Sequence, residues 1–448
     1  MFVDFLLKLW KQNEAREALI WRDQPHTYGW LLENFELWLK WVDENVRPGV
    51  VVALEADFSP NSVALFLALA ERRSVLVPLT ESVRAQKAEF LSIARCEQTI
   101  QFAAADAVTL TPLAGDGDHP LYDRLREIGH PGLVVFSSAS TGKSKAAVHD
   151  LIPLLDKFKL RRAAFRTIAF LLFDHLGGLN TILHTLANAG CVITVKDRTP
   201  DAVLGAVERH GAELLPVSPT FLHLMLISDA HKRHNLSSLK RIAYGTEPMP
   251  EHTLKKIHEL LPDVSLQQTY GLSEVGVLRS KSKDANSLWV KVGGEGFETR
   301  VVGGILQIKA RSTMLGYLNE PSPFTADGWF DTGDAVETDG EYIKILGRTS
   351  EIINVGGKKV YPAEIENILQ ELEAVAAATV YGEQNPITGA IVCADVTPSR
   401  PLANSDRKQF VDEVKKHCRQ RLERFKVPLR INVVATYQYT ERFKKART

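Results

Sequence analysis

Cysteine is scarce in this sequence of 448 residues. The four cysteines lie far apart, and no Cys-x-x-Cys pair or Cys and His spacing is typical of a zinc site. The pattern therefore offers neither a disulfide framework nor a zinc centre as the basis of the fold. We expect free thiols in a reducing compartment at Cys96, Cys191, Cys393 and Cys418.

An excess of charge of either sign is also missing. The chain holds 54 basic and 54 acidic residues, which gives a formal net charge of zero. A balanced chain offers no broad electrostatic field to nucleic acid or to an anionic membrane surface. Small molecules are therefore the expected partners.

Long hydrophobic runs are absent as well. No apolar run reaches the roughly 18 residues that a membrane-spanning helix needs. Residues 1–20 have an apolar start, but Asp4 interrupts it, and Lys8 and Lys11 follow. Without a small-residue cleavage site, this segment predicts an amphipathic helix rather than a signal peptide. We expect a cytoplasmic protein.

The sequence does contain the alternation of an α/β fold. Hydrophobic residues make up 45% of the chain and charged residues 24%, as in soluble globular proteins, and the length favours two or three domains. Apolar β-rich runs alternate with helical patterns, which favours a parallel sheet. The predicted strands are 50–54, 75–79, 132–136, 168–172 and 191–195, and the predicted helices are 61–70 and 179–189.

The pattern changes twice toward the C-terminus. Short strands with glycine turns at 288–292, 298–302 and 305–309 predict an antiparallel β subdomain over about 285–347. After Gly347 a small α+β domain is predicted from strand 359–361, helix 362–372, strands 376–381 and 390–396, helix 407–423 and strand 431–434. We therefore expect an α/β chain with a large N-terminal domain, 1–347, of parallel and mixed sheets with flanking helices, and a small C-terminal domain, 348–448.

One short stretch suggests phosphate chemistry. Residues 137–149 read SSASTGKSKAAVH and follow a predicted strand, so their hydroxyl, ammonium and backbone N–H groups could face a polyphosphate. A mononucleotide loop of the G-x-x-x-x-G-K-[ST] type would need glycine where Ser137 stands. A solvated Ser-rich turn is the alternative for this stretch taken alone.

Three further motifs follow it in order. They are QTYGLSE (268–274), GWFDTGD (328–334) and GRTSEIINVGGKKVYPAEIE (347–366). Together the four motifs resemble the adenylate-forming superfamily of acyl-CoA synthetases, peptide-synthetase adenylation domains and luciferases, over nearly the whole chain. The resemblance implies that a carboxylate and ATP form an acyl-adenylate and pyrophosphate, after which a thiol, commonly that of coenzyme A, displaces AMP. It also implies a C-terminal domain that is mobile between the two steps.

The resemblance assigns phosphate binding to the loop that begins at Ser137. Ser138, Ser140 and Thr141 would donate to the β- and γ-phosphates, Gly142 lies in the same loop, and Lys145 stands at the family's lysine. Ala139, Ser144 and Ala146 replace a glycine, a proline and a glycine of the family pattern. Ala139 is the important departure, because its Cβ restricts the positive-φ conformations that a mobile loop can use.

The resemblance also places the nucleotide. Tyr270 matches an aromatic residue that stacks on adenine, next to Gly271; Ser273 matches a hydroxyl that meets phosphate; and Glu274 matches an acid that helps to hold Mg²⁺. Asp334 would accept both ribose hydroxyls, and Arg348 would approach the same ribose. Gly245, Thr246, Glu247 and Pro248 match a segment along the adenine edge.

The remaining assignments concern the acyl group and the second step. His175 stands where relatives place a residue near the acyl carboxylate, although a lone histidine between apolar runs is as often structural. Lys444 aligns with the C-terminal lysine that reaches the reacting carboxylate, with Lys445 and a solvated basic tail as alternatives. Ser350 matches the hinge, and Gly356 and Gly357 would line the pantetheine tunnel after the domain rotates.

Two other function classes stay beside the acyl-CoA ligase. One is an enzyme that adenylates an acid, or handles an acyl group, for a carrier-protein thiol in polyketide or peptide biosynthesis. The other is a degenerate relative that binds nucleotide, suggested by Ala139 and by Phe443 in place of a glycine. A P-loop NTPase is discarded, because it needs a helix from Lys143 and leaves the later motifs unexplained.

Overall fold

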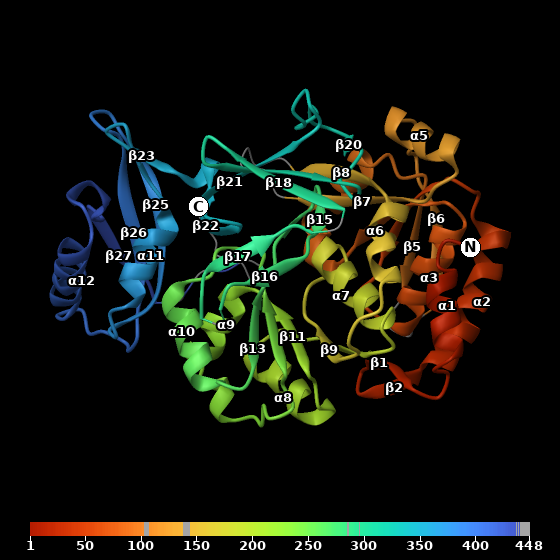
Figure 1. Ribbon diagram of the computed structural model, residues 1–448, viewed down its shortest axis with the longest axis horizontal. Coiled ribbons are helices and arrows are strands. Elements are labelled where there is room, and N and C mark those ends of the chain that lie inside the picture. The colour runs from red at the N-terminus through yellow and green to blue at the C-terminus, as the bar shows by residue number, and fades with distance from the viewer. Residues whose placement is uncertain are drawn as a thin grey trace.

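The computed structural model describes residues 1–102, 107–137, 144–284, 286–294, 296–435, 437 and 439. Two large sheets and a smaller β sheet form the main body, and a lobe with its own sheet lies at the C-terminal end of the chain (Figure 1). The predicted α/β fold with parallel and mixed sheets is confirmed.

The first seven-stranded sheet is parallel except for one edge hairpin. In spatial order its strands are β13 (Ser265–Gln268), β12 (Arg241–Tyr244), β11 (Leu214–Val217), β9 (Arg166–Ala169), β10 (Cys191–Thr194), β1 (Glu17–Trp21) and β2 (Gln24–Thr27). β9 ends at Ala169, three residues before the predicted end, because the chain turns there toward a helix. The turn packs so closely that a Cβ on Gly178 would lie 1.9 Å from the carbonyl oxygen of Leu172.

The second seven-stranded sheet combines a parallel centre with antiparallel edges. In spatial order its strands are β20 (Gly316–Tyr317), β8 (Lys145–Asp150), β7 (Gly132–Ser137), β4 (Val75–Leu79), β3 (Val51–Glu55), β5 (Gln98–Phe102) and β6 (Val108–Pro112). β3 and β4 are parallel and are joined by α3 (Pro60–Glu71), as the β-α-β pattern predicts. β8 runs antiparallel to both β7 and β20.

Helices cover the sheets and separate them. They are α1 (Asp4–Lys11), α2 (Tyr28–Asn45), α4 (Lys87–Ile93), α5 (Pro120–Ile128), α6 (Leu151–Asp156), α7 (Leu176–Leu186), α8 (Pro200–His210), α9 (Pro219–Ile227) and α10 (Glu251–Leu260). Alternate strand residues face different cores. On β3, Val52 packs in the core shared with α3 and α7, while Val51 packs on the opposite face. Helix α1 is amphipathic as expected, and the following residues 17–21 form β1.

The predicted antiparallel β subdomain is a six-stranded sheet. Its strands are β16 (Ser280–Ser282), β17 (Trp289–Val292), β22 (Tyr342–Arg348), β21 (Phe330–Asp339), β19 (Ile305–Ala310) and β18 (Phe297–Val302). A short hairpin of β14 (Gly271–Leu272) and β15 (Gly276–Val277) precedes it.

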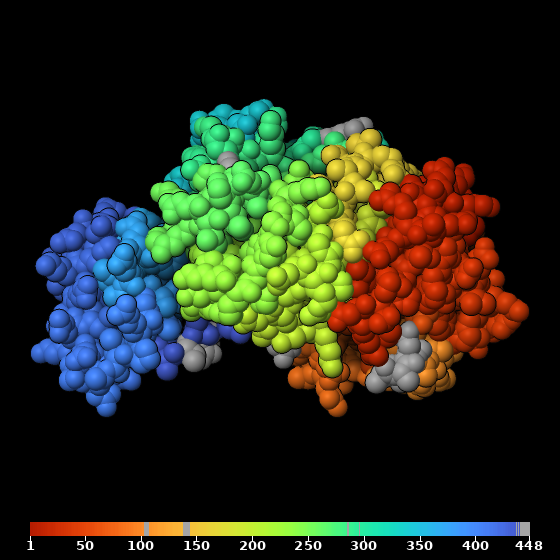
Figure 2. Space-filling model, turned by 90° about the horizontal axis from the view of Figure 1, so that it is seen from below, coloured from red at the N-terminus to blue at the C-terminus, as the bar shows by residue number. Residues whose placement is uncertain are grey.

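The C-terminal lobe has a five-stranded sheet with two helices. The elements are β23 (Ile353–Val355), β24 (Lys358–Val360), α11 (Pro362–Gln370), β25 (Val375–Asn385), β26 (Gly389–Pro398), α12 (Arg407–Arg421) and β27 (Arg430–Val433). Strand β23 was not expected. A hydrophobic cluster forms the core of this lobe, and its members all lie within 353–433. In Figure 2 the lobe is a separate bulge beside the main body. The side chain of Asn367, on the lobe, accepts a hydrogen bond from the amide of Glu251, the first residue of α10.

Two expectations from composition can be compared with the structure. All four cysteines are buried and free. Among the helices described, none is both long and apolar enough to cross a membrane.

Candidate functional site

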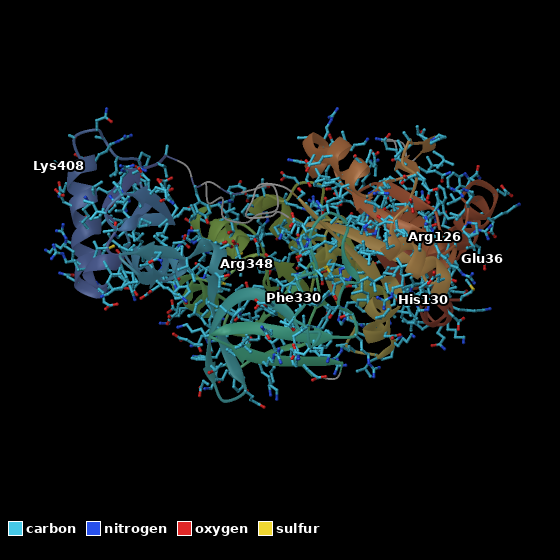
Figure 3. All side chains as sticks on the ribbon, turned by 90° about the horizontal axis from the view of Figure 1, so that it is seen from above. Glu36, Arg126, His130, Phe330, Arg348 and Lys408 are labelled. Atoms are coloured by element: carbon cyan, nitrogen blue, oxygen red, sulfur yellow. The ribbon has the colours of Figure 1, made fainter. Side chains whose placement is uncertain are left out.

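A cavity of about 2440 Å³ lies where the two large sheets, the β subdomain and the C-terminal lobe meet. Its walls include residues from all four sequence motifs, although these motifs are far apart in the chain. Figure 3 shows Arg348 beside the C-terminal lobe, with Phe330 further toward the body; both line this cavity.

The predicted phosphate loop connects two antiparallel strands. Ser137 ends β7, Lys145 begins β8, and the two residues pair directly in the sheet. Ser138, Ser140, Thr141 and Gly142 lie outside the described residues. The chain continues from Lys145 as a strand rather than as a helix, so the mononucleotide P-loop arrangement is excluded on geometry as well as sequence.

A segment more than 170 residues downstream fixes the start of β8. The Asn319 side chain accepts a hydrogen bond from the Ala146 amide at 3.1 Å and donates one to the Ser144 carbonyl at 2.8 Å. The ammonium group of Lys145 lies 5.5 Å from the ring centre of Tyr317 on β20. The hydrogen bonds of Asn319 to the residues on either side therefore fix the backbone at Lys145, whose side chain lines the cavity.

Tyr317 also reaches the predicted metal-binding acid. Its hydroxyl donates to Glu274 Oε1 at 2.7 Å, and the Glu274 residue is 9% exposed. Burial, and secondly the charge of Glu274, raise the pKa of Tyr317, so its phenol remains a donor. Tyr317 thus connects the lysine of the first motif to the acid of the second.

A buried histidine fixes the backbone next to the same acid. His149 Nε2 lies 2.6 Å from the Ser273 carbonyl, and Nδ1 lies 3.3 Å from the Ser312 carbonyl. Burial lowers the pKa of His149 to about 4, so the ring is neutral and carries one N–H. The shorter contact identifies Nε2 as the donor, which fixes the backbone just before Glu274.

The third and fourth motifs meet the second in a buried network. The Tyr270 hydroxyl donates to Asp334 Oδ2 at 2.5 Å, and Arg348 Nε lies 3.1 Å from Asp334 Oδ1. Asp334 and Arg348 stand opposite each other on β21 and β22. Burial raises the pKa of Asp334, while the Arg348 charge and the two hydrogen bonds oppose that shift. The network thereby holds a carboxylate, a phenol ring and a guanidinium at one wall of the cavity.

The segment 245–248 forms the neighbouring wall, directly after β12. A Cβ on Gly245 would lie 2.4 Å from Thr269 Oγ1 and 2.6 Å from the Thr269 carbonyl, so only glycine fits this close approach. Thr246 has a φ of +74°, which is rare for a β-branched residue and frequent at ligand sites. The Glu247 carboxylate accepts a hydrogen bond from the Thr220 amide at 2.7 Å, near the start of α9.

Of the other predicted residues, the structure describes His175, Gly356 and Gly357. His175 lines the cavity at the N-cap of α7, where its Nδ1 accepts from the Gly177 amide at 3.4 Å. Gly356 and Gly357 lie in the turn between β23 and β24 with φ of +59° and +81°, beside a second, smaller cavity. Lys444 and the rest of the C-terminal motif lie outside the described residues.

Sequence reasoning missed three residues that organise the site: His149, Tyr317 and Asn319. His149 ends the stretch that first indicated phosphate binding, but an isolated histidine carries no local signal of what it contacts. Tyr317 and Asn319 follow a glycine in the segment GYLN, which has the composition of an ordinary turn. Their partners lie 43 and more residues away in the chain.

Comparison with known proteins identifies the family. The profile described as "AMP-binding enzyme" matches residues 8–317, and that described as "AMP-binding enzyme C-terminal domain" matches residues 364–444. The chain belongs to the AMP-binding enzyme family. The adenylate-forming superfamily, predicted from the four motifs, is thereby confirmed for this AMP-binding enzyme.

Relatives of this AMP-binding enzyme with known activities include CoA ligases. It is 30% identical over 296 residues to an indoleacetate–CoA ligase of Aromatoleum aromaticum, a match that covers 60% of this chain and 57% of that enzyme. It is 28% identical over 427 residues to a feruloyl-CoA synthase of an Amycolatopsis species, covering 86% of this chain and 84% of the synthase. The chain thus spans little more than half the length of the first of these relatives.

The fold is also that of a solved ligase. The structure of the anthranilate CoA ligase AuaEII in complex with anthranoyl-AMP superimposes with a TM-score of 0.82 at 18% identity. The superposition covers 98% of this AMP-binding enzyme and 94% of the ligase. At this identity the likeness concerns the fold alone.

Proposed function

We propose that this AMP-binding enzyme is an ATP-dependent carboxylic acid:CoA ligase that acts through an acyl-adenylate. The observation that carries the proposal is the convergence of the four motifs on one cavity, with Lys145, Glu274 and the Tyr270–Asp334–Arg348 network in its walls. The relatives named as CoA ligases support the same reaction class.

In the first step a carboxylate oxygen of the acid attacks the α-phosphorus of ATP, and pyrophosphate leaves. Two anions must approach each other, so cations and hydrogen-bond donors are needed around the triphosphate. Lys145 supplies a cation held in place from two sides, and Ser137 stands at the edge of the same hairpin. Ser138, Ser140, Thr141 and Gly142 complete the proposed phosphate loop.

The ribose and adenine are assigned to the other walls. Asp334 would accept the ribose hydroxyls while Tyr270 and Arg348 hold its carboxylate in place, and the Tyr270 ring would stack on the base. Segment 245–248 would follow the edge of the adenine. Gly271 and Ser273 lie between Tyr270 and Glu274 and would face the phosphates.

A magnesium ion is proposed at Glu274. Within the part of the chain described, no cluster of three or more His, Cys, Asp or Glu side chains could hold a metal ion. A single buried carboxylate nevertheless fits Mg²⁺, which takes one or two carboxylates together with phosphate and water oxygens. When bound, the ion would neutralise phosphate charge; Tyr317 orients the Glu274 carboxylate that would hold it.

The second step needs a different arrangement of the chain. We propose a boundary after Gly347, with 1–347 as the large domain, about 285–347 as its β subdomain and 348–448 as the small one. The separate hydrophobic cluster within 353–433 supports this division. Rotation about Ser350 would exchange Lys444, which acts in the first step, for the Gly356–Gly357 turn, and the CoA sulfur would then attack the acyl carbonyl and release AMP.

Hydroxylamine trapping across aryl, medium-chain and polyketide-derived acids tests the first step. Acyl-hydroxamate should form with ATP and Mg²⁺, and Lys444→Ala should reduce it strongly while Lys445→Ala should not. If the wild type traps none of the acids and releases no pyrophosphate, the chain is a degenerate nucleotide-binding relative. Equal trapping by Lys444→Ala and the wild type would show that Lys444 does not act in the adenylation step.

A thiol-acceptor assay tests the second step. Acyl-CoA should form when free CoA is supplied with the best acid from the trapping panel. Acylation of a carrier-protein thiol, with none of CoA, would instead establish the carrier-loading alternative. Both acceptors are measured with one enzyme preparation, so an inactive preparation is recognised by its failure to release pyrophosphate.

A further inference from the structure

One arm of the cavity is not used by the nucleotide assignment. It runs along α7, whose residues Gly177, Asn180, Thr181, His184 and Thr185 line it at helical spacings of three and four. His175 stands at the head of this face. His184 lies nine positions further, which at 1.5 Å per residue is ~13 Å along the helix axis. The arm is therefore long enough for a ring or a medium chain.

The far end of this arm is basic. Lys157, Arg162, His184 and Arg241 all line the cavity there, and we call these four residues the basic end. The charges of Arg162, Lys157 and Arg241 act on His184 and, together with its burial as the larger cause, lower its pKa to about 4. The four side chains therefore lie near one another.

Among the residues that the structure describes, no Asp or Glu forms an ion pair with any member of the basic end. Asp156 also lines the cavity, but it pairs with Lys159. Arg241 Nε is buried without a hydrogen-bond acceptor in the described part of the chain, and its guanidinium lies 5.4 Å from the ring centre of Phe165. Lys157 donates to the Val277 carbonyl at 3.1 Å, a neutral partner.

Lys157, His184 and Arg241 are half-buried, Arg162 is exposed, and the Nε atom of Arg241 is itself buried. A buried cationic donor is ordinarily paired, because it otherwise loses its hydration, so Arg241 costs stability unless a ligand supplies an acceptor. Burial lowers the pKa of Lys157 to about 7, which is the response of a cation that lacks a counter-charge. An oxygen acceptor arriving at this end would meet up to four donors.

We propose that the acid activated by this enzyme carries a second oxygen function, a carboxylate or a hydroxyl, at the end remote from the reacting carboxylate, and that the basic end recognises it. This inference rests on the proposed ligase function, since it places the reacting carboxylate near His175. It adds the substrate class: oxygen-substituted acids rather than plain aryl or alkyl acids.

Matched acids test it. Benzoate, 4-hydroxybenzoate and terephthalate form one series, and octanoate and suberate form another. The oxygen-substituted member should exceed its plain counterpart in kcat/KM by about tenfold or more in at least one series, as expected for a hydrogen bond to a charged group. Comparable kcat/KM values for plain and substituted acids in both series would overturn the proposal.

Variants separate recognition from folding. Lys157→Met, and Arg162→Gln at an exposed position, should lower kcat/KM for the preferred acid about tenfold and leave its plain counterpart within about twofold. Lys240→Met is the matched control, because Lys240 is exposed, pairs with Glu213 and lies outside the cavity lining. An equal loss for both acids, or a rise in the KM for CoA alone, would show that the basic end does not read the acid.

Calorimetry of the same acids distinguishes the two proposals. In one outcome, no acid is adenylated, but the substituted acids bind at least about tenfold tighter than the plain ones and Lys157→Met removes that difference. The ligase proposal would then be wrong, and acid recognition by the basic end would be supported. If acids are adenylated without such a preference, the ligase proposal is supported and the proposal that the basic end recognises the acid is wrong.

Discussion

Replacing Asp334 by asparagine should remove the enzyme's ability to distinguish ribose from 2′-deoxyribose. The carboxylate receives Tyr270 Oη at 2.5 Å and Arg348 Nε at 3.1 Å, and it is 5% exposed. An asparagine side chain keeps one acceptor oxygen and adds an N–H₂ group, which meets a donor or the Arg348 cation on one side. If Asp334 binds the ribose as proposed, the ribose hydroxyls then lose their charged acceptor.

The magnitude follows from the hydrogen bonds involved. A hydrogen bond to a charged group contributes about 1.5–3 kcal/mol, and about 1.4 kcal/mol corresponds to tenfold in an equilibrium constant. We expect the wild type to favour ATP over 2′-deoxy-ATP by about 10- to 100-fold in kcat/KM, and Asp334→Asn to bring that ratio close to one.

The assay is pyrophosphate release with each nucleotide at a saturating concentration of acid. Tyr270→Phe is the companion variant, since it keeps the ring and removes only the donor to Asp334. Its preference for ATP should fall by only about threefold, because Arg348 still holds the carboxylate. If Asp334→Asn loses activity equally with both nucleotides, while circular dichroism shows an intact fold, the carboxylate does not bind the ribose.

Three further results are expected. Gly245→Ala should raise the KM for ATP by about tenfold, because its Cβ collides with Thr269. Gly205→Ala, within α8, should leave this KM unchanged, because the nearest atom, His234 Cε1, is 3.5 Å away. His149→Ala should lower the free energy of unfolding by about 3 kcal/mol in urea titrations, since it leaves a buried void and frees the Ser273 carbonyl; a loss below about 1 kcal/mol would contradict this role. Lys157→Met should raise the melting temperature most at and below pH 7, where the wild type buries a charged ammonium. Because the folded pKa is about 7 and the ordinary value is 10.5, wild-type stability rises between those pH values, so the advantage of methionine should shrink across that window. An advantage that does not change with pH would show that Lys157 titrates normally.

The sequence motifs named residues that line one cavity, and they could do so because each motif is local. Tyr270, Asp334 and Arg348 each lie in a short sequence motif whose residue spacing identifies them. The parallel strands were predicted from apolar runs such as 75–79. No single motif, however, indicates which residues of the other motifs it contacts. The hydrogen bond from Tyr270 to Asp334 joins residues 64 positions apart, and only the folded chain brings them together.

The missed features share one physical cause. His149, Tyr317 and Asn319 act by positioning other residues, and a positioning side chain has no composition that distinguishes it from an ordinary core or turn residue. The basic end is similar, because its four members come from a short turn, a loop, a helix and the first residue of a strand. That no acid pairs with them among the described residues is a property of the fold and cannot be read from a chain whose total charge is zero.

The pairing of β8 has a consequence for how the chain is made. The four central residues of β8 are buried, and in the described part of the chain its outer edge is covered by β20 and by Asn319. During synthesis that edge therefore stays open until about 170 more residues have emerged. An open edge strand is a template for pairing with other chains. Nascent chains halted before residue 316 should therefore aggregate, while those that extend past 319 should not. The segment that positions Lys145 in the folded enzyme is therefore also the segment that covers the exposed edge of β8 during synthesis.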